Sequence, residues 1–430
     1  MCHRSYNEQL DIKQVCTHNT VIEASTQHRA SHRPMMLART HALRPLNNHV
    51  SRVSFSTAPK KYAESRPNGG GPGGRSSNPG ITVAVFGAGG FLGRYVCSNL
   101  GEIGTKTYIG NRGDEFELRH LRPMFDLGRS RFMFYSSRDR DSMAEVIADA
   151  DVVVNLIGKY YETKTLSDKA SFPYIDYKTN FSFEEANVDI PKTIAELCTE
   201  MQVDNLIHVS SLAASPDSES EWARTKYAGE CAVKEAYPWA TIIRPTQLFG
   251  YEDKLLNFFA NQAAMAPFGY VPMVDGGQAL TQPVFMDDVA NVIAKVVGNA
   301  EGYEGKTIDC FGSRDFTYKE LAEFVYDITS QYPELIDVPK SLMLNIAKIT
   351  QFQPNPSVTP DLVELWSEDY VAKSPEWYDS QVGADKVLTM ADLDVEPTPI
   401  EKIAFRYLHR FRKGGHFVLA EGYHGIHQEK

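Results

Sequence analysis

A glycine-rich turn follows the apolar run Ile81–Phe86 and occupies residues 87–93. Glycine at its first position lets the chain reverse tightly, glycine at the fourth lets phosphate oxygens approach the backbone, and glycine at the seventh lets a helix pack closely on a sheet. The free N–H groups and the dipole of a helix that begins at Phe91 favour an anion. The spacing G-x-x-G-x-x-G also occurs in turns without a ligand, but the order strand, turn, helix favours a nucleotide. The segment therefore predicts a pyrophosphate-binding turn formed by Gly87, Gly89, Gly90, Phe91, Leu92 and Gly93.

Two further strand ends carry side chains suited to the same ligand. The second predicted strand ends at Gly110 and is followed by Asn111 and Arg112. In a dinucleotide fold this position meets the adenosine ribose, where an arginine favours a 2′-phosphate and an acidic residue repels it. Arg112 therefore predicts NADP(H) over NAD(H), with an ordinary surface arginine as the alternative. The wall of the nucleotide crevice is predicted at the end of the fourth strand, at Asn155, Leu156, Ile157 and Gly158.

A parallel sheet is needed to bring these residues together. Short apolar runs predict strands at 81–86, 106–110, 132–135, 151–156, 205–210 and 241–244. Helical patterns lie between them at 91–100, 139–148, 184–201 and 221–236. This alternation is typical of an α/β, Rossmann-like doubly wound sheet with helices on both faces. The polar segment Thr163–Phe183 predicts a loop insertion.

The region after Arg244 is less regular and predicts a smaller, mostly helical C-terminal region. One helical pattern follows residues 283–289 and ends at about Val297. Two more lie at 318–331 and 340–351, and one strand is predicted at 307–311. One face of Ser341–Ile349 is strongly apolar, and three alternatives remain open for it: the protein's own core, a partner, or a membrane surface. The basic run Lys402–Lys413 predicts either a solvated helix face or a partner contact.

The first 80 residues differ in composition from the rest. They contain 11 Lys or Arg and 4 Asp or Glu, although the whole chain has a net charge of −11. The Arg-, Ser- and Thr-rich segment from Met35 has no acidic residue until Glu64, which is typical of a mitochondrial transit peptide. A disordered basic arm is the alternative, as is a true start at Met35 or Met36. The predicted domains are a transit peptide at 1–57, a flexible Gly/Pro/Ser-rich linker at 58–80, a nucleotide-binding domain at 81–312 and the C-terminal region at 313–430.

Composition argues against several classes of protein. The acidic body argues against nucleic acid as the main partner. The sequence has no apolar stretch of about 18 residues, so it predicts no transmembrane helix. Its six cysteines are scattered without a C-x-x-C pair, which argues against a disulfide framework and against a zinc site.

The chain resembles the short-chain dehydrogenase/reductase superfamily in its extended or atypical branch. The resemblance covers residues 81 to about 311 and is carried by the glycine turn, the segment 155–158, the strand end His208–Ser211 and the segment Arg244–Gly250. It implies cofactor contacts for Ser210, Lys226, Pro245 and Thr246. In active members a serine ends the fifth strand and a Tyr-x-x-x-Lys pair follows on the next helix. The tyrosine exchanges the proton, and the lysine lowers the pKa of the tyrosine.

The helix at 221–236 carries the lysine of that pair but not the tyrosine. Lys226 is in place, and Trp222 stands four residues before it. An indole N–H cannot act as a general acid or base at physiological pH. Tyr227 points about 100° further round the helix and cannot simply replace the missing group. The sequence therefore predicts no catalytic residue.

A narrower resemblance is to the dehydrogenase-like accessory subunits of mitochondrial respiratory complex I. It is carried by Gly74–Ser77, Leu121–Met124 and Phe249–Asp253, among others. It implies a non-catalytic, NADPH-binding subunit needed for assembly or stability of the matrix arm near the quinone site. The subunit would lie peripherally on the matrix side of the inner membrane. Its partners would be other complex I subunits and a peripheral lipid contact, with no nucleic acid.

The chain departs from that family in three places, and two rival functions stay open. The loop Thr163–Phe183 is longer, Ser136 stands where an acidic residue is expected near the adenine, and Trp222 replaces a tyrosine that some members retain. The first rival is an active mitochondrial NADPH-dependent reductase or epimerase, which would need another acid such as Ser211 with a bound water. The second is a nucleic-acid-binding member of the atypical branch, which the acidic body disfavours.

Overall fold

The computed structural model describes residues 74–412 except 167–176, 267–268, 354–355 and 382–385. The chain divides into two units, Met1–Pro59 and Lys60–Lys430, and all described residues belong to the second. The predicted transit peptide, most of the predicted linker, the middle of the 163–183 segment and the end of the basic run lie outside the described residues. Those predictions therefore remain predictions.

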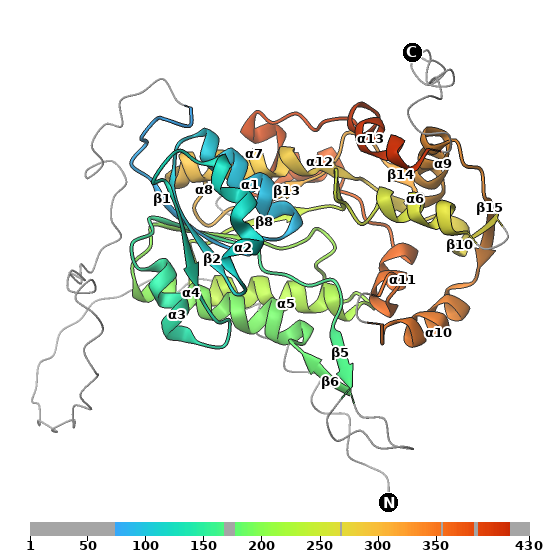
Figure 1. Cartoon of the computed structure of the whole chain (residues 1–430), viewed down its shortest axis with the longest axis horizontal. Coiled ribbons are helices and arrows are strands. Elements are labelled where there is room, and N and C mark those ends of the chain that lie inside the picture. The colour runs from blue at the N-terminus through green and yellow to red at the C-terminus, as the bar shows by residue number, and fades with distance from the viewer. Residues whose placement is uncertain (1–73, 167–176, 267–268, 354–355, 382–385, 413–430) are drawn as a thin grey trace, which may run out of the picture. The chain divides into compact units, whose positions relative to one another are not determined.

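An eight-stranded parallel sheet lies at the centre of this unit (Figure 1), in the order β16-β13-β8-β7-β4-β1-β2-β3. In the central register Val85 of β1 lies opposite Ile109 of β2 on one side and Val154 of β4 on the other. The order runs in opposite directions from β1, so β1 and β4 flank the switch point at which folds of this kind bind ligands. The strands are β1 Thr82–Phe86, β2 Lys106–Asn111, β3 Ser130–Phe134, β4 Val152–Asn155, β7 Asn205–Val209, β8 Thr241–Pro245, β13 Thr307–Cys310 and β16 Leu388–Thr389.

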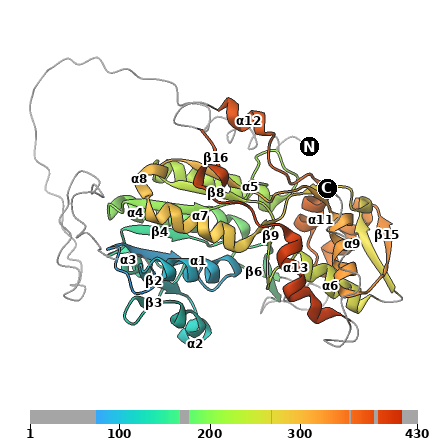
Figure 2. The ribbon, with the colours of Figure 1, turned by 90° about the horizontal axis from the view of Figure 1, so that it is seen from above.

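Helices cover both faces of the sheet because its central strands are apolar on both sides. In β1, Val83 and Val85 face the core under α1 and α7, whereas Ala84 and Phe86 face the core under α3 and α4. Figure 2 shows α1 and α7 lying along the sheet, and α5 packs against α4. The helices of this part are α1 Phe91–Glu102, α2 Glu115–Leu118, the 3₁₀ turn η1 Arg119–Met124, α3 Arg140–Ile147, the π-helical turn η2 Glu185–Asp189, α4 Ile190–Glu200, α5 Glu221–Ala236, α7 Met286–Gly298 and α8 Ala300–Tyr303.

The predicted α/β doubly wound fold is confirmed, with one error in the first part of the chain. The predicted loop at Thr163–Phe183 is wrong at both ends. The strands β5, Thr163–Leu166, and β6, Tyr177–Asn180, pair antiparallel there. Threonine and tyrosine suit strands, and the polar composition of the segment concealed this propensity.

The helices α6, α9 and α13 lie together to one side of the sheet in both views (Figures 1 and 2), around a second apolar cluster that includes Phe259, Leu321 and Ile403. The region is mostly helical as predicted, but it also returns to the main sheet, where Leu388 of β16 pairs with Ile308 of β13. Its elements are β9 Leu248–Phe249, α6 Leu256–Met265, β10 Tyr270–Val274, η4 Asp275–Gly277, β11 Leu280–Thr281, β12 Val284–Phe285, β14 Phe316–Thr317, α9 Tyr318–Thr329, β15 Glu334–Val338, α10 Lys340–Thr350, α11 Pro360–Ser367, α12 Pro375–Ser380, η5 Ala391–Leu393, α13 Ile400–Leu408 and η6 His409–Phe411.

The last helix is fixed to the loop that follows β9. The hydroxyl of Tyr407 donates to Asp253 Oδ2 at 2.8 Å, and Arg410 Nη2 donates to Asn257 Oδ1 at 2.8 Å. Burial raises the pKa of Asp253 to about 6. Part of the basic run at 402–412 therefore contacts the protein itself.

Helix α10 has two apolar stripes rather than one. Met343 and Ala347 are buried against Val274 and Val363, which confirms the own-core alternative for that side. The second stripe, about 100° round the helix, is exposed, with relative exposures of 53%, 45% and 75% for Leu342, Ile346 and Ile349. Among the described residues, no helix is long and apolar enough to cross a membrane.

The close packing of α5 on η2 predicts that one added methyl group lowers the free energy of unfolding. A Cβ at Gly229 would lie 2.0 Å from the carbonyl oxygen of Asn187, so Gly229→Ala should force the two elements apart. We expect a loss of about 1–3 kcal/mol in the free energy of unfolding, measured by chemical denaturation. Gly298→Ala is the matched control, because a Cβ there meets nothing within 4 Å. Equal stabilities of the two variants would contradict the packing described.

Candidate functional site

The glycine turn has the backbone geometry that its sequence predicts. Gly87 has φ +84°, and a Cβ there would lie 3.0 Å from the carbonyl carbon of Leu156. A Cβ at Gly93 would lie 2.6 Å from Ala88 Cα, so only glycine lets α1 pack this closely. Gly90 is the extended residue that begins α1, and the first turn of that helix contains no acidic side chain. The amino terminus of α1 is thus suited to an anion.

The end of β4 lies against the turn and leads to the lysine of α5. The side chain of Asn155 is buried, with Nδ2 3.2 Å from His208 Nδ1 and with Oδ1 accepting from Ile157 N at 3.0 Å. A Cβ at Gly158 would lie 2.9 Å from Lys226 Nζ. The predicted residues of the glycine turn, the β4 end and α5 therefore lie around one edge of the sheet.

Lys226 is a buried amine with an altered pKa. Burial lowers the pKa of Lys226 to about 8, and Glu230 one turn further along α5 opposes this shift. Glu230 is itself held by Arg244 of β8, whose Nε lies 3.0 and 3.1 Å from its two carboxylate oxygens. Burial and the charge of Lys226 lower the pKa of His208 to about 3, which keeps its ring neutral.

Several buried polar atoms at this edge find no hydrogen-bond partner among the described residues. They are Ser210 Oγ, Trp222 Nε1, Asn187 Oδ1 and His208 Nε2. Buried polar groups are normally hydrogen-bonded, so atoms left without a partner mark a place where a ligand or water supplies one. Together with the glycine cradle, this set of donors and acceptors fits a dinucleotide that carries both phosphates and hydroxyl groups.

Positive charge gathers at the end of β2. The guanidinium carbons of Arg112 and Arg138 lie 5.5 and 4.3 Å from the centre of the Phe181 ring, and Lys159 Nζ lies 5.9 Å from it. Arg138 is paired with Glu185 at 2.6 Å. Burial, and after it the charge of Arg112, lowers the pKa of Lys159. This cluster suits a phosphate group at the adenosine end of the ligand.

Not every predicted site residue offers its side chain to a ligand. Asn111 closes a turn with Gly113, whose N–H donates to Asn111 Oδ1 at 3.1 Å. Leu92 is buried in the core under α1. Thr246 Oγ1 donates to Gln282 O at 2.6 Å, and Pro245 O accepts from Tyr370 OH at 3.0 Å. These residues contribute their backbone or support the site from behind.

A C-terminal segment occupies the space beside Trp222 and Ser211. Leu365 of α11 packs against Trp222 in a small apolar cluster. The hydroxyl of Tyr370 pairs with Ser211 Oγ, so Ser211 is engaged within the protein. Burial raises the pKa of Tyr370, which is the opposite of what an acid-base catalyst at neutral pH needs.

Sequence reasoning missed Arg138, Lys159, Asn187 and Tyr370. Arg138 follows the third strand as Arg112 follows the second, and that position was an available signal. Asn187 lies in a π-helical turn, which its local sequence does not reveal. Tyr370 reaches the site from 125 residues beyond Pro245 and has no local signal.

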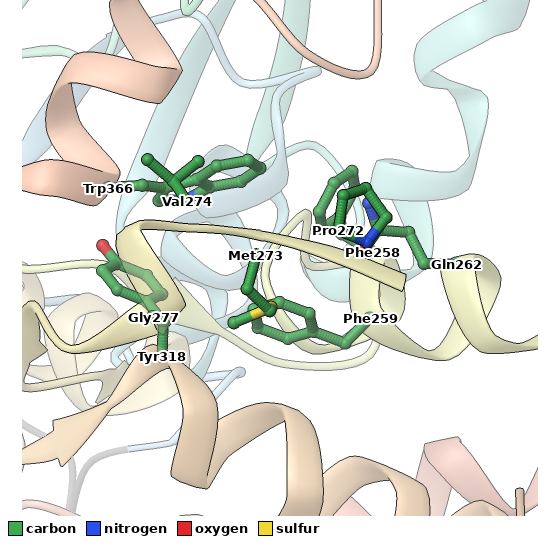
Figure 3. Close-up of a pocket in the computed structure, with 9 residues that line it drawn as sticks. All are labelled: Phe258, Phe259, Gln262, Pro272, Met273, Val274, Gly277, Tyr318 and Trp366. Atoms are coloured by element: carbon green, nitrogen blue, oxygen red, sulfur yellow. The ribbon is translucent and has the colours of Figure 1, made fainter. Parts of the chain in front are cut away.

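The described part also has a small cavity away from the glycine turn (Figure 3), between α6, β10, α9 and α11. Figure 3 shows its aromatic lining, which includes Phe258, Phe259, Tyr318 and Trp366. Its volume of about 20 Å³ accommodates roughly one water molecule. It is therefore too small for a nucleotide or an organic substrate.

Fold and site together define a nucleotide-binding protein of the extended dehydrogenase type. The chain belongs to the NAD dependent epimerase/dehydratase family, whose model matches residues 83–310. The fold is shared with the Citrobacter sp. triphenylmethane reductase complexed with NADP(H), at a TM-score of 0.54 and 15% identity, over 76% of this chain and 99% of that one.

Within that family the chain is homologous to one mitochondrial subunit. It is 36% identical to NADH dehydrogenase (ubiquinone) 1 alpha subcomplex subunit 9, mitochondrial, of Arabidopsis thaliana, over 86% of this chain and 88% of that protein. It is also 36% identical to the protein of the same name from Rattus norvegicus, over 80% of this chain and 83% of that one. The narrower resemblance predicted from the sequence is confirmed.

The lowered pKa of Lys226 predicts a pH-dependent stability. Between pH 8 and about 10.5 the unfolded lysine binds a proton that the folded one does not, so the free energy of unfolding rises with pH. The free energy of unfolding of the Lys226→Met variant should not show this rise. We expect the variant to be more stable at pH 7 by up to about 3 kcal/mol, with the difference shrinking toward pH 10.5 in urea titrations. Lys319→Met, on a half-exposed side chain of α9, is the control. A difference independent of pH would contradict a buried Lys226.

Proposed function

We propose that this chain is an accessory, non-catalytic subunit of mitochondrial NADH:ubiquinone oxidoreductase (complex I) that binds NADPH as a structural cofactor. The observation that carries the proposal is the contrast within one site. The glycine turn and Lys226 are retained, whereas Trp222 stands at the position of the catalytic tyrosine. Homology to the mitochondrial alpha subcomplex subunit 9 supports the assignment to complex I and to the matrix side of the inner membrane.

The geometry beside Trp222 supports a non-catalytic role. Trp222 is 4% exposed and packs in one apolar cluster with Leu365, while the Tyr370 hydroxyl pairs with Ser211. Tyr160 stacks on the indole at 5.4 Å between ring centres. A substrate next to the nicotinamide would therefore have to displace side chains of the protein itself, and it would find no activated acid there.

The preference for NADPH over NADH rests on the cations at the end of β2. Arg112, Arg138 and Lys159 surround Phe181, and a 2′-phosphate next to them would gain charge-assisted hydrogen bonds. A ligand that binds only the folded state stabilises it by about 4 kcal/mol at a thousandfold excess over Kd. The nucleotide would therefore hold the subunit in an assembly-competent form.

The exposed stripe of α10 is the surface best suited to assembly. Leu342, Ile346 and Ile349 expose apolar surface on one face of one helix, and apolar patches of this kind mark interaction sites. We assign this stripe to a contact with another complex I subunit. The N-terminal segment 1–57 would deliver the chain to the matrix, and residues 58–80 would link it to the folded part.

Native electrophoresis of gently solubilised mitochondrial membranes tests the proposal. We expect the chain to migrate with NADH dehydrogenase activity, and the same band to release NADPH in an amount about equal to that of the subunit. Mass spectrometry identifies both. Migration as a small free species would overturn the complex I assignment, and release of NADH would overturn the nucleotide preference.

Restoring the tyrosine tests the non-catalytic role. We expect Trp222→Tyr to show no oxidation of NADPH by carbonyl or quinone substrates, because Leu365 and Tyr370 still fill the cleft. NADPH absorbance measures turnover, and the wild-type protein is the control. Turnover by the wild type would favour the reductase alternative. Turnover by the variant alone would show that the cleft is open to substrate.

A further inference from the structure

One segment of the C-terminal region spans the candidate nucleotide site and the exposed face of α10. We call residues 359–370, which comprise α11 and the residues up to Tyr370, the strap. Its Tyr370 pairs with Ser211 and donates to Pro245 O at the ends of β7 and β8. Its Glu368 accepts from Ser218 Oγ at 3.2 Å. The strap thus contacts the sheet edge on which the predicted cofactor residues lie.

The strap also supplies the amino-terminal cap of α5. The N-cap residue Ser220 makes no side-chain cap to its own helix. Instead, Asp361 Oδ1 accepts from Glu221 N at 2.9 Å and from Trp222 N at 3.2 Å. An uncapped helix start leaves N–H groups unsatisfied, and a carboxylate there also interacts favourably with the helix dipole. The first turn of α5 therefore depends on a residue 140 positions away in the sequence.

The first turn of α5 leads directly into the nucleotide site. Trp222, whose backbone Asp361 caps, packs against Leu365 of the strap. Lys226 lies one turn further along the same helix, beside Gly158. A ligand that engages Lys226 and the unpartnered Ser210 Oγ holds α5 and the β7 end in place, and these are the elements on which the strap rests.

The other side of the strap supports α10. Val363 packs with Met343 and Ala347 on the buried stripe of α10. Val358 O, next to the strap, accepts from Thr350 Oγ1 at 2.8 Å. At the other end of α10, Lys340 Nζ lies 2.6 Å from Glu219, just before α5. The strap and the start of α5 therefore help to position the exposed stripe, together with Asp275, which accepts from Lys340 N at 2.9 Å.

We propose that Asp361 and Leu365 are positioning residues through which nucleotide binding at Lys226 and the docking face of α10 stabilise each other. The inference rests on the proposed nucleotide binding. Coupling between two sites is reciprocal, so a partner bound to α10 tightens nucleotide binding by the same factor by which the nucleotide tightens the partner contact.

Hydrogen–deuterium exchange of the full chain with and without NADPH tests the coupling. We expect NADPH to slow exchange in residues 87–93, in the first turns of α5, in the strap and in residues 340–350. Slowed exchange at 87–93 with no change in the strap and α10 would overturn the coupling and leave nucleotide binding intact. No change in any of these segments would overturn the proposed nucleotide binding itself.

Two variants of the strap separate a positioning role from general destabilisation. We expect Asp361→Ala and Leu365→Ala to weaken NADPH binding about fivefold or more in calorimetric titrations. At saturating NADPH their residues 87–93 should still be protected, while protection of 340–350 is lost. Asp361→Asn keeps the acceptor and should bind NADPH nearly as the wild type does.

Asp392→Ala is the matched control for Asp361→Ala. Asp392 also accepts from a backbone N–H, that of Thr389 at 2.7 Å, but it lies beside β16 and interacts with Thr389 and Lys386 rather than with the strap. The Asp392→Ala variant should bind NADPH with the affinity of the wild type. Equal weakening by Asp392→Ala and Asp361→Ala would overturn the proposal, because loss of stability alone would then explain both. If Asp361→Ala does not fold, the exchange experiment on the wild-type chain still decides the question.

Discussion

The N–H groups at the start of α5 need hydrogen-bond acceptors. In this protein Asp361, from a helix distant in sequence, accepts hydrogen bonds from two of them. The constraint is general, because the first turn of a helix has no acceptors of its own. In this protein the constraint acts on the helix of the candidate site. The helix that carries Lys226 and Trp222 cannot be completed by the sheet domain alone, so the C-terminal region is joined to the nucleotide site by a hydrogen bond as well as by packing. Together with the pairing of β16 with β13, this bond joins the two predicted regions, which belong to one unit in the structure.

In the proposed role, charge at the site serves binding rather than proton transfer. Lys226 keeps its place, but an indole stands four residues before it, and burial raises the pKa of Tyr370 despite the hydrogen bond with Ser211. The buried pair of Glu230 and Arg244 holds the middle of α5 against β8. A pair of this kind contributes little net stability, but removing one partner is costly. In the proposed non-catalytic role, this polar network serves to fix the backbone rather than to transfer protons.

The C-terminal region also contacts the sheet domain at places away from α5. β16 extends the sheet beside β13, and Tyr407 of α13 is bonded to the buried carboxyl group of Asp253. These contacts leave one stripe of α10 uncovered while its other stripe is buried. An apolar stripe held on a well-packed helix is suited to a partner of fixed geometry, which is consistent with a subunit of a large complex.

Local residue chemistry was enough to predict the nucleotide turn and most of the sheet. Gly87 must be glycine because of its positive φ, and Gly93 because it approaches the backbone of Ala88 five residues earlier. Alternating apolar runs likewise located the strands of the first half. Tertiary structure alone decided the strap, the pairing of β5 with β6 and the three cations around Phe181. The strap and the cations depend on residues far apart in sequence, whose meeting is set by how the sheet and helices pack and is encoded by no local periodicity. The strands β5 and β6 are separated by only ten residues, and their pairing was missed because the segment is polar in composition.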